Sequence, residues 1–173
     1  NLINVYLDAV LHPRLTPQVL QQEGWHYALE HIDAPLSYKG VVFNEMKGAN
    51  SSPERVLSTH IKQSLFPGHT YGLDAGGDPA HIPDLTFADF TAFHRNYYHP
   101  SNARIYFYGN DPADHRLDLL ASYLDTYEAT SVDSAIAPPT HFSTPQTYTK
   151  SYAVDGQSDE VKKSMAAINW LLP

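Results

Sequence analysis

One residue type and several sequence patterns are missing from this 173-residue chain, and each absence removes a class of function. There is no cysteine, so disulfide bonds and thiolate chemistry are excluded, although the compartment stays open. No apolar run approaches the roughly 20 residues that a membrane-spanning helix needs, which argues against a membrane protein. Basic residues number 11 against 19 acidic ones, and the net charge of −8 argues against a nonspecific nucleic-acid surface.

Motifs for nucleophilic catalysis and for phosphate binding are also missing. The spacing supports no Ser-His-Asp arrangement, and the chain has no cysteine nucleophile. The glycine-rich segment 72–79 lacks the G-x-G-x-x-G spacing and the lysine of a phosphate-binding loop. We expect its glycines to allow turns with positive φ, and a part in shaping a substrate chamber is the weaker alternative.

Apolar residues at helical spacing, together with capping residues, divide most of the chain into helices. Ser52 before Pro53, and Thr86 three residues before Asp89, are typical helix starts. The expected helices begin near Leu2, Gln18, Tyr38, Ser52, Thr86 and Pro112.

Other segments are typical of strands or of a linker. We expect strands over Ala103–Tyr108, Tyr148–Val154 and Met165–Leu172. Serine, threonine and proline concentrate in residues 131–147, which is the best candidate linker in the chain. The tyrosines around the first strand are expected to be packing residues; they are Tyr97, Tyr98, Tyr106 and Tyr108.

One carboxylate stands out because of the helix face on which the pattern places it. In the expected helix from Tyr38 to Ala49, Glu45 shares the i, i+3, i+4, i+7 face with apolar residues. Those residues are Val42, Met46 and Ala49. A carboxylate in an apolar environment is costly unless it is paired or binds a metal. A solvated glutamate, or one paired with Lys39 or Lys47, is the alternative that periodicity alone favours.

The segment Gly40–Gly48, which reads Gly-Val-Val-Phe-Asn-Glu-Met-Lys-Gly, closely resembles the presequence protease family of zinc metallopeptidases. That family belongs to the pitrilysin and insulinase group, the inverted zincins. Tyr38 stands where many insulinase-type enzymes carry a second glutamate, which fits the presequence protease branch better. Further segments match the family in the same order; they are Gln22–Trp25, Ser52–Arg55, Leu65–Pro67, Gly76–Pro79 and His99–Arg104.

The resemblance implies that Glu45 is a zinc ligand. In the family, two histidines of an H-x-x-E-H helix hold the zinc with a downstream glutamate that matches Glu45, and the H-x-x-E-H glutamate is the general base. This chain contains no H-x-x-E-H, so we expect no catalytic residue in it. The expectation is an internal piece, inactive by itself, of a zinc-dependent endopeptidase that degrades short unstructured peptides such as cleaved targeting peptides. The rest of the parent chain would complete the site.

The resemblance also implies the fold and the domain organisation. The family fold is α+β, a mixed and mainly antiparallel sheet backed by helices, and it is duplicated along a longer chain. Residues 1–130 would be the later part of the first such domain, 131–147 a linker, and 148–173 the first strands of a second domain. The family suggests the mitochondrial matrix, the plastid stroma or the bacterial cytoplasm, and the sequence does not choose among them.

Two other functions stay open. The wider group includes subunits that have lost the metal motif and serve as scaffold or partner-binding subunits. A complete histidine-rich metal-binding module is the other possibility, since the chain has 10 histidines. His26 and His31 are its most tempting pair, but at five residues apart they lie about 140° from sharing a helix face. His60, on an apolar helix face, is expected to be a hydrogen-bonded core histidine.

Overall fold

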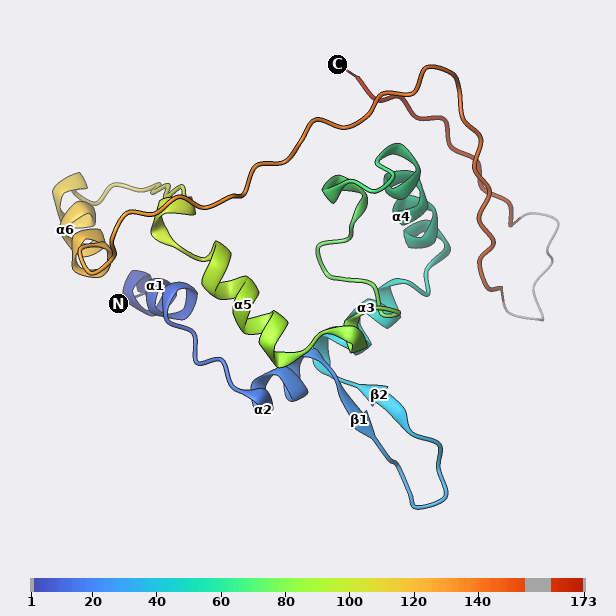
Figure 1. The fold of residues 1–173 in the computed structure, drawn as a ribbon, viewed down its shortest axis with the longest axis horizontal. Coiled ribbons are helices and arrows are strands. Elements are labelled where there is room, and N and C mark those ends of the chain that lie inside the picture. The colour runs from blue at the N-terminus through green and yellow to red at the C-terminus, as the bar shows by residue number, and fades with distance from the viewer. Residues whose placement is uncertain (1, 155–162, 173) are drawn as a thin grey trace. The chain divides into compact units, whose positions relative to one another are not determined.

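The computed structural model describes residues 2–154 and 163–172. Within them the chain forms six α-helices and a two-stranded antiparallel sheet, joined by loops and short turns (Figure 1). The sheet pairs β1 (His26–Ala28) with β2 (Ser37–Lys39). The α+β class expected from the sequence is confirmed. The helices are α1 (Leu2–Leu11), α2 (Pro17–Val19), α3 (Val41–Ala49), α4 (Pro53–Leu65), α5 (Phe87–Tyr97) and α6 (Ala113–Leu124).

Two helices begin at the capping residues that the sequence indicates. At α4 the Ser52 hydroxyl accepts a hydrogen bond from the Arg55 amide at 3.4 Å. At α5 the Thr86 hydroxyl accepts one from the Asp89 amide at 3.2 Å, and the Asp89 carboxylate accepts one from the Thr86 amide at 3.2 Å. These bonds satisfy amides that have no partner inside the helix, which fixes where each helix starts.

The chain divides into two compact units. The first comprises Asn1–Leu20 and Leu85–Ala135, and the second comprises Gln21–Asp84 and Ile136–Pro173. The first unit therefore holds α1, α5 and α6, whereas the second holds the hairpin, α3 and α4. Each unit draws on two separate stretches of sequence, so each depends on contacts between residues far apart in the chain.

Side-chain bonds to backbone carbonyls join the helices of the first unit. The Tyr123 hydroxyl of α6 donates to the carbonyl of Asn4 in α1 at 3.0 Å. The His94 ring of α5 lies with Nε2 2.9 Å from the carbonyl of Val10, also in α1. These bonds satisfy polar groups that would be costly to bury unpaired, and they hold α5 and α6 against α1.

The hydrophobic core is small. Among the residues that the structure describes, only Leu7, Phe43 and Ile82 are buried apolar side chains. Large apolar side chains such as Ile32, at 89% exposed, and Ile168, at 80%, lie in solvent. Soluble proteins rarely leave wide apolar areas uncovered, so these faces are suited to contact with further protein.

The three segments expected to be strands do not form a sheet. Ala103–Tyr108, Tyr148–Val154 and the described segment 165–172 have no regular secondary structure. A strand needs a neighbouring strand to satisfy its backbone amides and carbonyls, and no described part of the chain supplies one to them. The strand predictions are therefore wrong for this structure.

The tyrosines predicted to pack around the first of these segments are exposed instead. Tyr106 is 86% exposed and Tyr108 is 93% exposed, while Tyr97 and Tyr98 are exposed at 40% and 48%. The packing prediction is wrong for Tyr106 and Tyr108, because their segment has no sheet to join. Tyr97 and Tyr98 instead pack on Phe93 and His94 of α5, with ring centres 4.9 Å and 4.6 Å apart.

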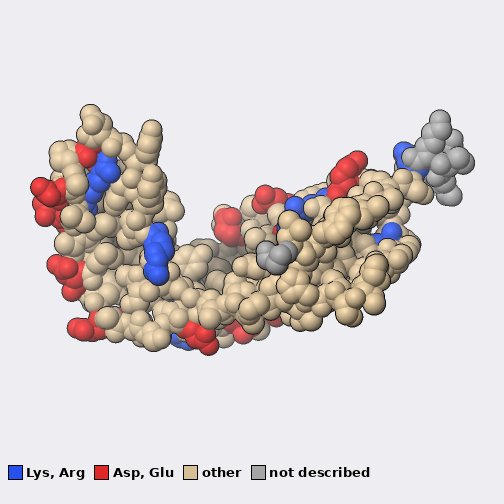
Figure 2. Space-filling model, turned by 90° about the horizontal axis from the view of Figure 1, so that it is seen from above, with Lys and Arg blue, Asp and Glu red and all other residues tan. Residues whose placement is uncertain are grey.

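The surface carries charges of both signs. On the face drawn in Figure 2, acidic and basic side chains are scattered, with no continuous patch of either sign. Within the described residues, no helix combines the length and the apolar character that crossing a bilayer requires.

Candidate functional site

The helix that carries Glu45 begins at a close backbone approach. Gly40, immediately before α3, has a φ of +150°. A Cβ placed on Gly40 would lie 2.2 Å from the carbonyl oxygen of Gly24. Only glycine fits this conformation and this contact. This close contact places the base of the β1–β2 hairpin against the start of α3. The helix therefore begins after Gly40 and not at Tyr38, where we expected it to begin.

Tyr38 and Lys39 therefore belong to β2 rather than to the helix. The expected helix boundary is wrong by three residues, because Gly40 separates the strand from Val41, where α3 begins. The most buried residue of α3 also lies off the expected apolar face, because the hairpin residue Tyr38 packs on Phe43. Phe43, at 6% exposed, is the most buried residue of the helix.

Glu45 lies on the exposed side of α3. At 100° per residue it is about 200° round the helix from Phe43, and it is exposed to solvent. Val42, Met46 and Ala49 are half-buried, as the apolar pattern predicts. Glu45 makes no hydrogen bond or ion pair with any described residue, and Lys39 pairs instead with Glu30 at 3.1 Å. The expectation that Glu45 sits in an apolar environment is wrong, so burial does not force it to meet a cation.

The loop after α4 fixes the other side of α3. The carboxylate of Asp74 pairs with the guanidinium of Arg55 in α4 and also accepts a hydrogen bond from the Gly76 amide at 3.0 Å. Gly76 lies directly against the Met46 side chain, leaving no room for a Cβ beside the sulfur atom. These contacts hold segment 72–79 against two helices and leave the Glu45 side of α3 uncovered within this unit.

The described residues do not form a complete set of metal ligands. Across residues 2–154 and 163–172, no three histidine, aspartate or glutamate side chains come together in a group that could hold a metal ion. Glu45 therefore supplies a single accessible carboxylate. A zinc site needs three or four protein ligands, so the described residues do not fit a complete zinc site.

His26 and His31 lie in the hairpin rather than on a helix. His26 is in β1, where its Nδ1 is 2.7 Å from the Gln21 carbonyl oxygen. His31 lies in the turn after β1 and is exposed. The estimate that the two histidines lie about 140° apart assumed a helix over residues 26–31. The structure has a strand and a turn there instead.

An aromatic cluster covers one face of the hairpin, and the sequence analysis missed it. Tyr27 and Tyr38 are directly opposite each other across the strands, with ring centres 5.3 Å apart. Trp25 stands edge-on to both rings, at 5.4 Å from Tyr27 and 5.7 Å from Tyr38. The ring of Phe43 in α3 lies 5.9 Å from Tyr38. The alternation of Trp25 and Tyr27 before Tyr38 was the sequence signal for this face.

The phenol of Tyr38 is electrostatically perturbed by this arrangement. The hydrogen bond with Tyr27 raises the pKa of Tyr38; the charge of Tyr27, burial and, least of all, the charge of Asp84 raise it further. Asp84 also accepts a hydrogen bond from His81 Nδ1 at 3.2 Å.

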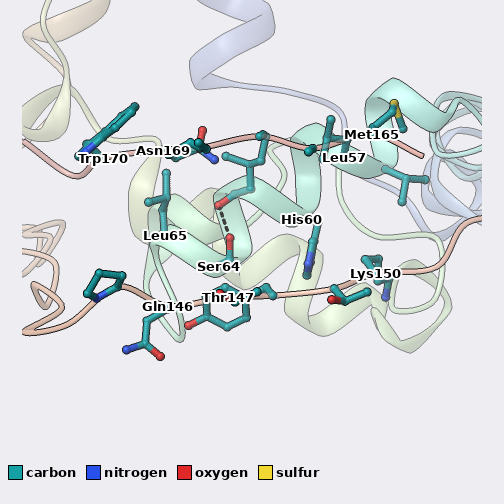
Figure 3. A pocket seen from close by; sticks show the side chains of 18 of the residues that line it. Leu57, His60, Ser64, Leu65, Gln146, Thr147, Lys150, Met165, Asn169 and Trp170 are labelled. Carbon is teal, nitrogen blue, oxygen red and sulfur yellow. Dashed lines mark hydrogen bonds between the residues drawn. The ribbon is translucent and has the colours of Figure 1, made fainter. Parts of the chain in front are cut away.

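A hollow of about 1110 Å³ lies beside α4 (Figure 3). The helix and two extended segments, 141–152 and 163–171, line it. His60 of α4 packs edge-on against Tyr148, with ring centres 6.3 Å apart. Its buried Nε2 atom has no hydrogen-bond partner within the described chain. The prediction that His60 lies on the apolar face of its helix is confirmed. The hydrogen bond predicted for its ring is not found among the described residues.

Comparison with known proteins identifies the family. The family described as "Peptidase M16 inactive domain" matches residues 84–173, more than half of the chain. Presequence protease 1, chloroplastic/mitochondrial, of Arabidopsis thaliana is 50% identical over 99% of this chain. Presequence protease, mitochondrial, of Xenopus laevis and Protein HypA of Clostridium perfringens are each 41% identical over 99% of it.

The matched length is a small part of these relatives. The chain spans 16% of the Arabidopsis protein, 17% of the Xenopus protein and 18% of the Clostridium protein. The similarity nevertheless runs along almost all of this chain, including Gly40–Gly48. The chain belongs to the M16 peptidase family and, within it, is similar to the presequence proteases.

Proposed function

We propose that this chain is part of a zinc-dependent endopeptidase that hydrolyses short unstructured peptides, and that Glu45 is one of the zinc ligands. The observation that carries the proposal is an exposed, unpaired carboxylate on a fixed helix, in a chain 50% identical to a presequence protease over 99% of its length. The names of several relatives describe proteases that act on presequences. Peptides are therefore the proposed substrates.

The role of Glu45 in this proposal is to hold the metal. Its carboxylate is a suitable zinc ligand, and the remaining ligands would come from outside the described residues. Bound zinc would supply a water of lowered pKa for attack on the peptide bond. The chain's own contribution is positional: Gly40, Phe43 and the loop around Asp74 fix α3, so the Glu45 carboxylate projects from a rigid element.

A scaffold function is the second candidate, and one observation favours it. The matching family is described as an inactive domain, and the match covers residues 84–173. Glu45 lies outside that range. A non-catalytic role for residues 84–173 is therefore compatible with a metal-ligand role for α3.

The finer fold of the family is also a proposal for this chain. Residues 1–130 would form the later part of a domain built on a mixed, mainly antiparallel sheet backed by helices. Residues 131–147 would be the linker to a second such domain, and residues 148–173 would be its first strands. The support is that Ala103–Tyr108 and segment 165–172 have no regular secondary structure and that most of their side chains are exposed. Partner strands from elsewhere in the parent would convert such segments into a sheet.

The cellular compartment is also a proposal, and it is based on the names and organisms of the relatives. Their names place two of the three in mitochondria or chloroplasts, and the third is bacterial. We propose an organelle matrix, a plastid stroma or a bacterial cytoplasm for the parent of this chain. Localisation of the tagged parent protein to a membrane or to the cell exterior would contradict this.

The test of the metal-ligand role uses the longer protein that contains this chain. We expect Glu45→Gln to lose most of its bound zinc and to lower kcat/KM for an unstructured peptide by about 10- to 100-fold or more. Mutation of residues that only hydrogen-bond to metal ligands already lowers metal affinity or activity by that factor. The fold should persist, because Glu45 makes no contact that stabilises α3. Glu128→Gln, which changes another exposed and unpaired glutamate, is the matched control. Full zinc content and normal turnover in Glu45→Gln would refute the assignment.

A further inference from the structure

A short segment, residues 130–137, is tied to the rest of the chain at three points, and we call it the strap. The Thr130 amide donates a hydrogen bond to the Ser101 hydroxyl at 3.1 Å. The Ser134 hydroxyl donates one to the side-chain oxygen of Asn102 at 2.7 Å. The third tie is made by a histidine, close to the end of the strap. Each of the three bonds lies within one compact unit.

His69 makes the third tie and, through its other ring nitrogen, caps a short 3₁₀ helix, Thr70–Gly72. Its Nε2 atom lies 2.7 Å from the Ala137 carbonyl oxygen, and its Nδ1 atom lies 3.1 Å from the Tyr71 amide nitrogen. A carbonyl oxygen can only accept and an amide can only donate. The two bonds therefore form together only when Nε2 carries the single ring proton and Nδ1 is the acceptor, which is the neutral form of the side chain.

His99 caps a second 3₁₀ helix, Pro100–Asn102, in the same way. Its Nδ1 atom accepts a hydrogen bond from the Ser101 amide at 3.1 Å. This is the helix whose Ser101 and Asn102 side chains hold the strap. His69 and His99 are both half-buried. All three ties of the strap therefore depend on an imidazole nitrogen that accepts a hydrogen bond.

We propose that the strap is a pH-sensitive device, which is held while His69 and His99 are neutral and released when they are protonated. Protonation places a hydrogen on Nδ1, which then faces an amide N–H and can no longer accept from it. The imidazole ring is rigid, so a movement that separates Nδ1 from the Tyr71 amide also displaces Nε2 from Ala137. Histidine is the side chain that ordinarily changes its charge between about pH 5 and 8.

The surroundings of His69 contain few ionisable groups. Its ring neighbours are Phe66 at 6.0 Å and Tyr71 at 4.9 Å, and only Tyr71 of these two is titratable. Helix α4 packs on the capped 3₁₀ helix, and the basic residue of its last turn, Lys62, is exposed. On the strap side, residues 134–140 contain no ionisable side chain. Protonation of the ring itself is therefore the main change of charge at this tie.

The surroundings of His99 contain charges of both signs. Tyr127, just after α6, packs edge-on against its ring at 5.3 Å, and the Tyr127 hydroxyl lies 3.4 Å from Nε2 of His12. Arg95 and Asp133 line a hollow of about 400 Å³ together with His99. Because these two charges are opposite in sign, the bond between Nδ1 and the Ser101 amide decides which protonation state suits the capped helix. His12 can gain a charge over the same pH range, so it needs a control.

The test uses NMR of the 173-residue chain at pH 8 and at pH 5, where carboxylates with ordinary pKa values near 4 stay mostly ionised. At pH 8 we expect the ring nitrogen shifts of His69 and His99 to show the neutral form protonated on Nε2. At pH 5 the protection of the Tyr71 and Ser101 amides, corrected for intrinsic exchange, should fall about fivefold, the factor expected for a typical cap. Backbone order parameters of residues 130–137 should fall with it.

Asparagine variants separate the two histidines from a general effect of acid. An asparagine side chain can accept from the amide two residues on at any pH. His69→Asn should therefore remove the pH dependence at Tyr71, and His99→Asn should remove it at Ser101, each leaving the other amide unchanged. His12→Asn, beside Tyr127, and His31→Asn, in the exposed turn of the hairpin, are controls that should keep both responses.

Four results would overturn the proposal. They are a ring protonated on Nδ1 at pH 8, equal amide protection at the two pH values, a pH response that survives in the asparagine variants, and a strap whose mobility does not change when the caps are lost. The first is measured on the original chain, so it stands even if a variant fails to fold. None of these measurements depends on zinc or on peptide hydrolysis, so the result is independent of the proposed function.

Discussion

At the residue scale, the position of the candidate site depends on a single glycine. Gly40 is buried, has a positive φ and touches the Gly24 carbonyl, so it sets both the end of β2 and the start of α3. This close contact holds both the aromatic cluster of the hairpin and the start of the helix that carries Glu45. A second glycine, Gly48, lies inside α3 with open space around it, which offers a comparison.

We expect Gly40→Ala to destabilise the chain by about 1–3 kcal/mol, because a Cβ strains the backbone and collides with the Gly24 carbonyl. Gly48→Ala should instead stabilise it by up to about 1 kcal/mol, since alanine favours a helix interior. Urea unfolding followed by circular dichroism measures both. An unchanged stability in Gly40→Ala would contradict the close approach described here.

The residues of α3 also show how much of the site could be predicted from the sequence. The apolar spacing of Val42, Met46 and Ala49 correctly predicted the half-buried side of α3, but it placed Glu45 with them. The error arose because the most buried residue, Phe43, is recognised only when the hairpin packs on the helix. Contacts between β2 and α3 come from the fold around Gly40, and periodicity within one helix does not contain them.

At the scale of elements, local capping was the most predictable feature. The Thr86–Asp89 capping box and the Ser52 cap formed where the sequence placed them, because each uses residues only three apart. The strands predicted at Ala103–Tyr108, Tyr148–Val154 and Met165–Leu172 did not form, although their sequence patterns are also typical. A strand depends on a partner elsewhere in the chain, so its own sequence is insufficient.

The capping box predicts a pH dependence. The hydrogen bond from the Thr86 hydroxyl, together with the one from its amide, lowers the pKa of Asp89. A lowered folded-state pKa stabilises the fold above the unfolded value of about 4, and this contribution is lost as the pH falls through the folded pKa. Asp89→Asn should therefore lower stability at pH 7 and reduce the loss seen on acidification.

The measurement is the free energy of unfolding in urea at pH 7 and at pH 3, for the original chain and for Asp89→Asn. Thr86→Ala should lose about 1 kcal/mol at pH 7 from its cap. Asp118→Asn, in the body of α6, is the control for a simple change of charge. An identical difference between the two pH values in all variants would show that the capping box does not contribute.

At the scale of the whole molecule, the small core and the exposed apolar side chains indicate that this chain packs against further protein. Only three apolar side chains are buried within the described residues, whereas Trp170 and Leu172 are exposed at 75% and 79%. The chain also spans 16% to 18% of the three relatives described above. These facts agree with a sheet that is completed elsewhere in a longer protein.

We therefore expect the amides of segment 165–172 to exchange hydrogen quickly in the 173-residue chain and to become protected in the longer protein, where neighbouring strands would take their hydrogen bonds. The amides of α5, which already has its own hydrogen bonds, serve as the internal reference. Equally fast exchange of 165–172 in both proteins would contradict the proposed second-domain strand.

The central claim is that Glu45 binds zinc in the completed protein, and anomalous diffraction at the zinc edge from crystals of the longer protein tests it most directly. The account predicts a zinc peak about 2.0–2.2 Å from a Glu45 carboxylate oxygen, the usual distance for this ligand. It also predicts that the peak disappears in Glu45→Gln. A zinc ion bound wholly by other residues, with the Glu45 carboxylate still in solvent, would contradict the account.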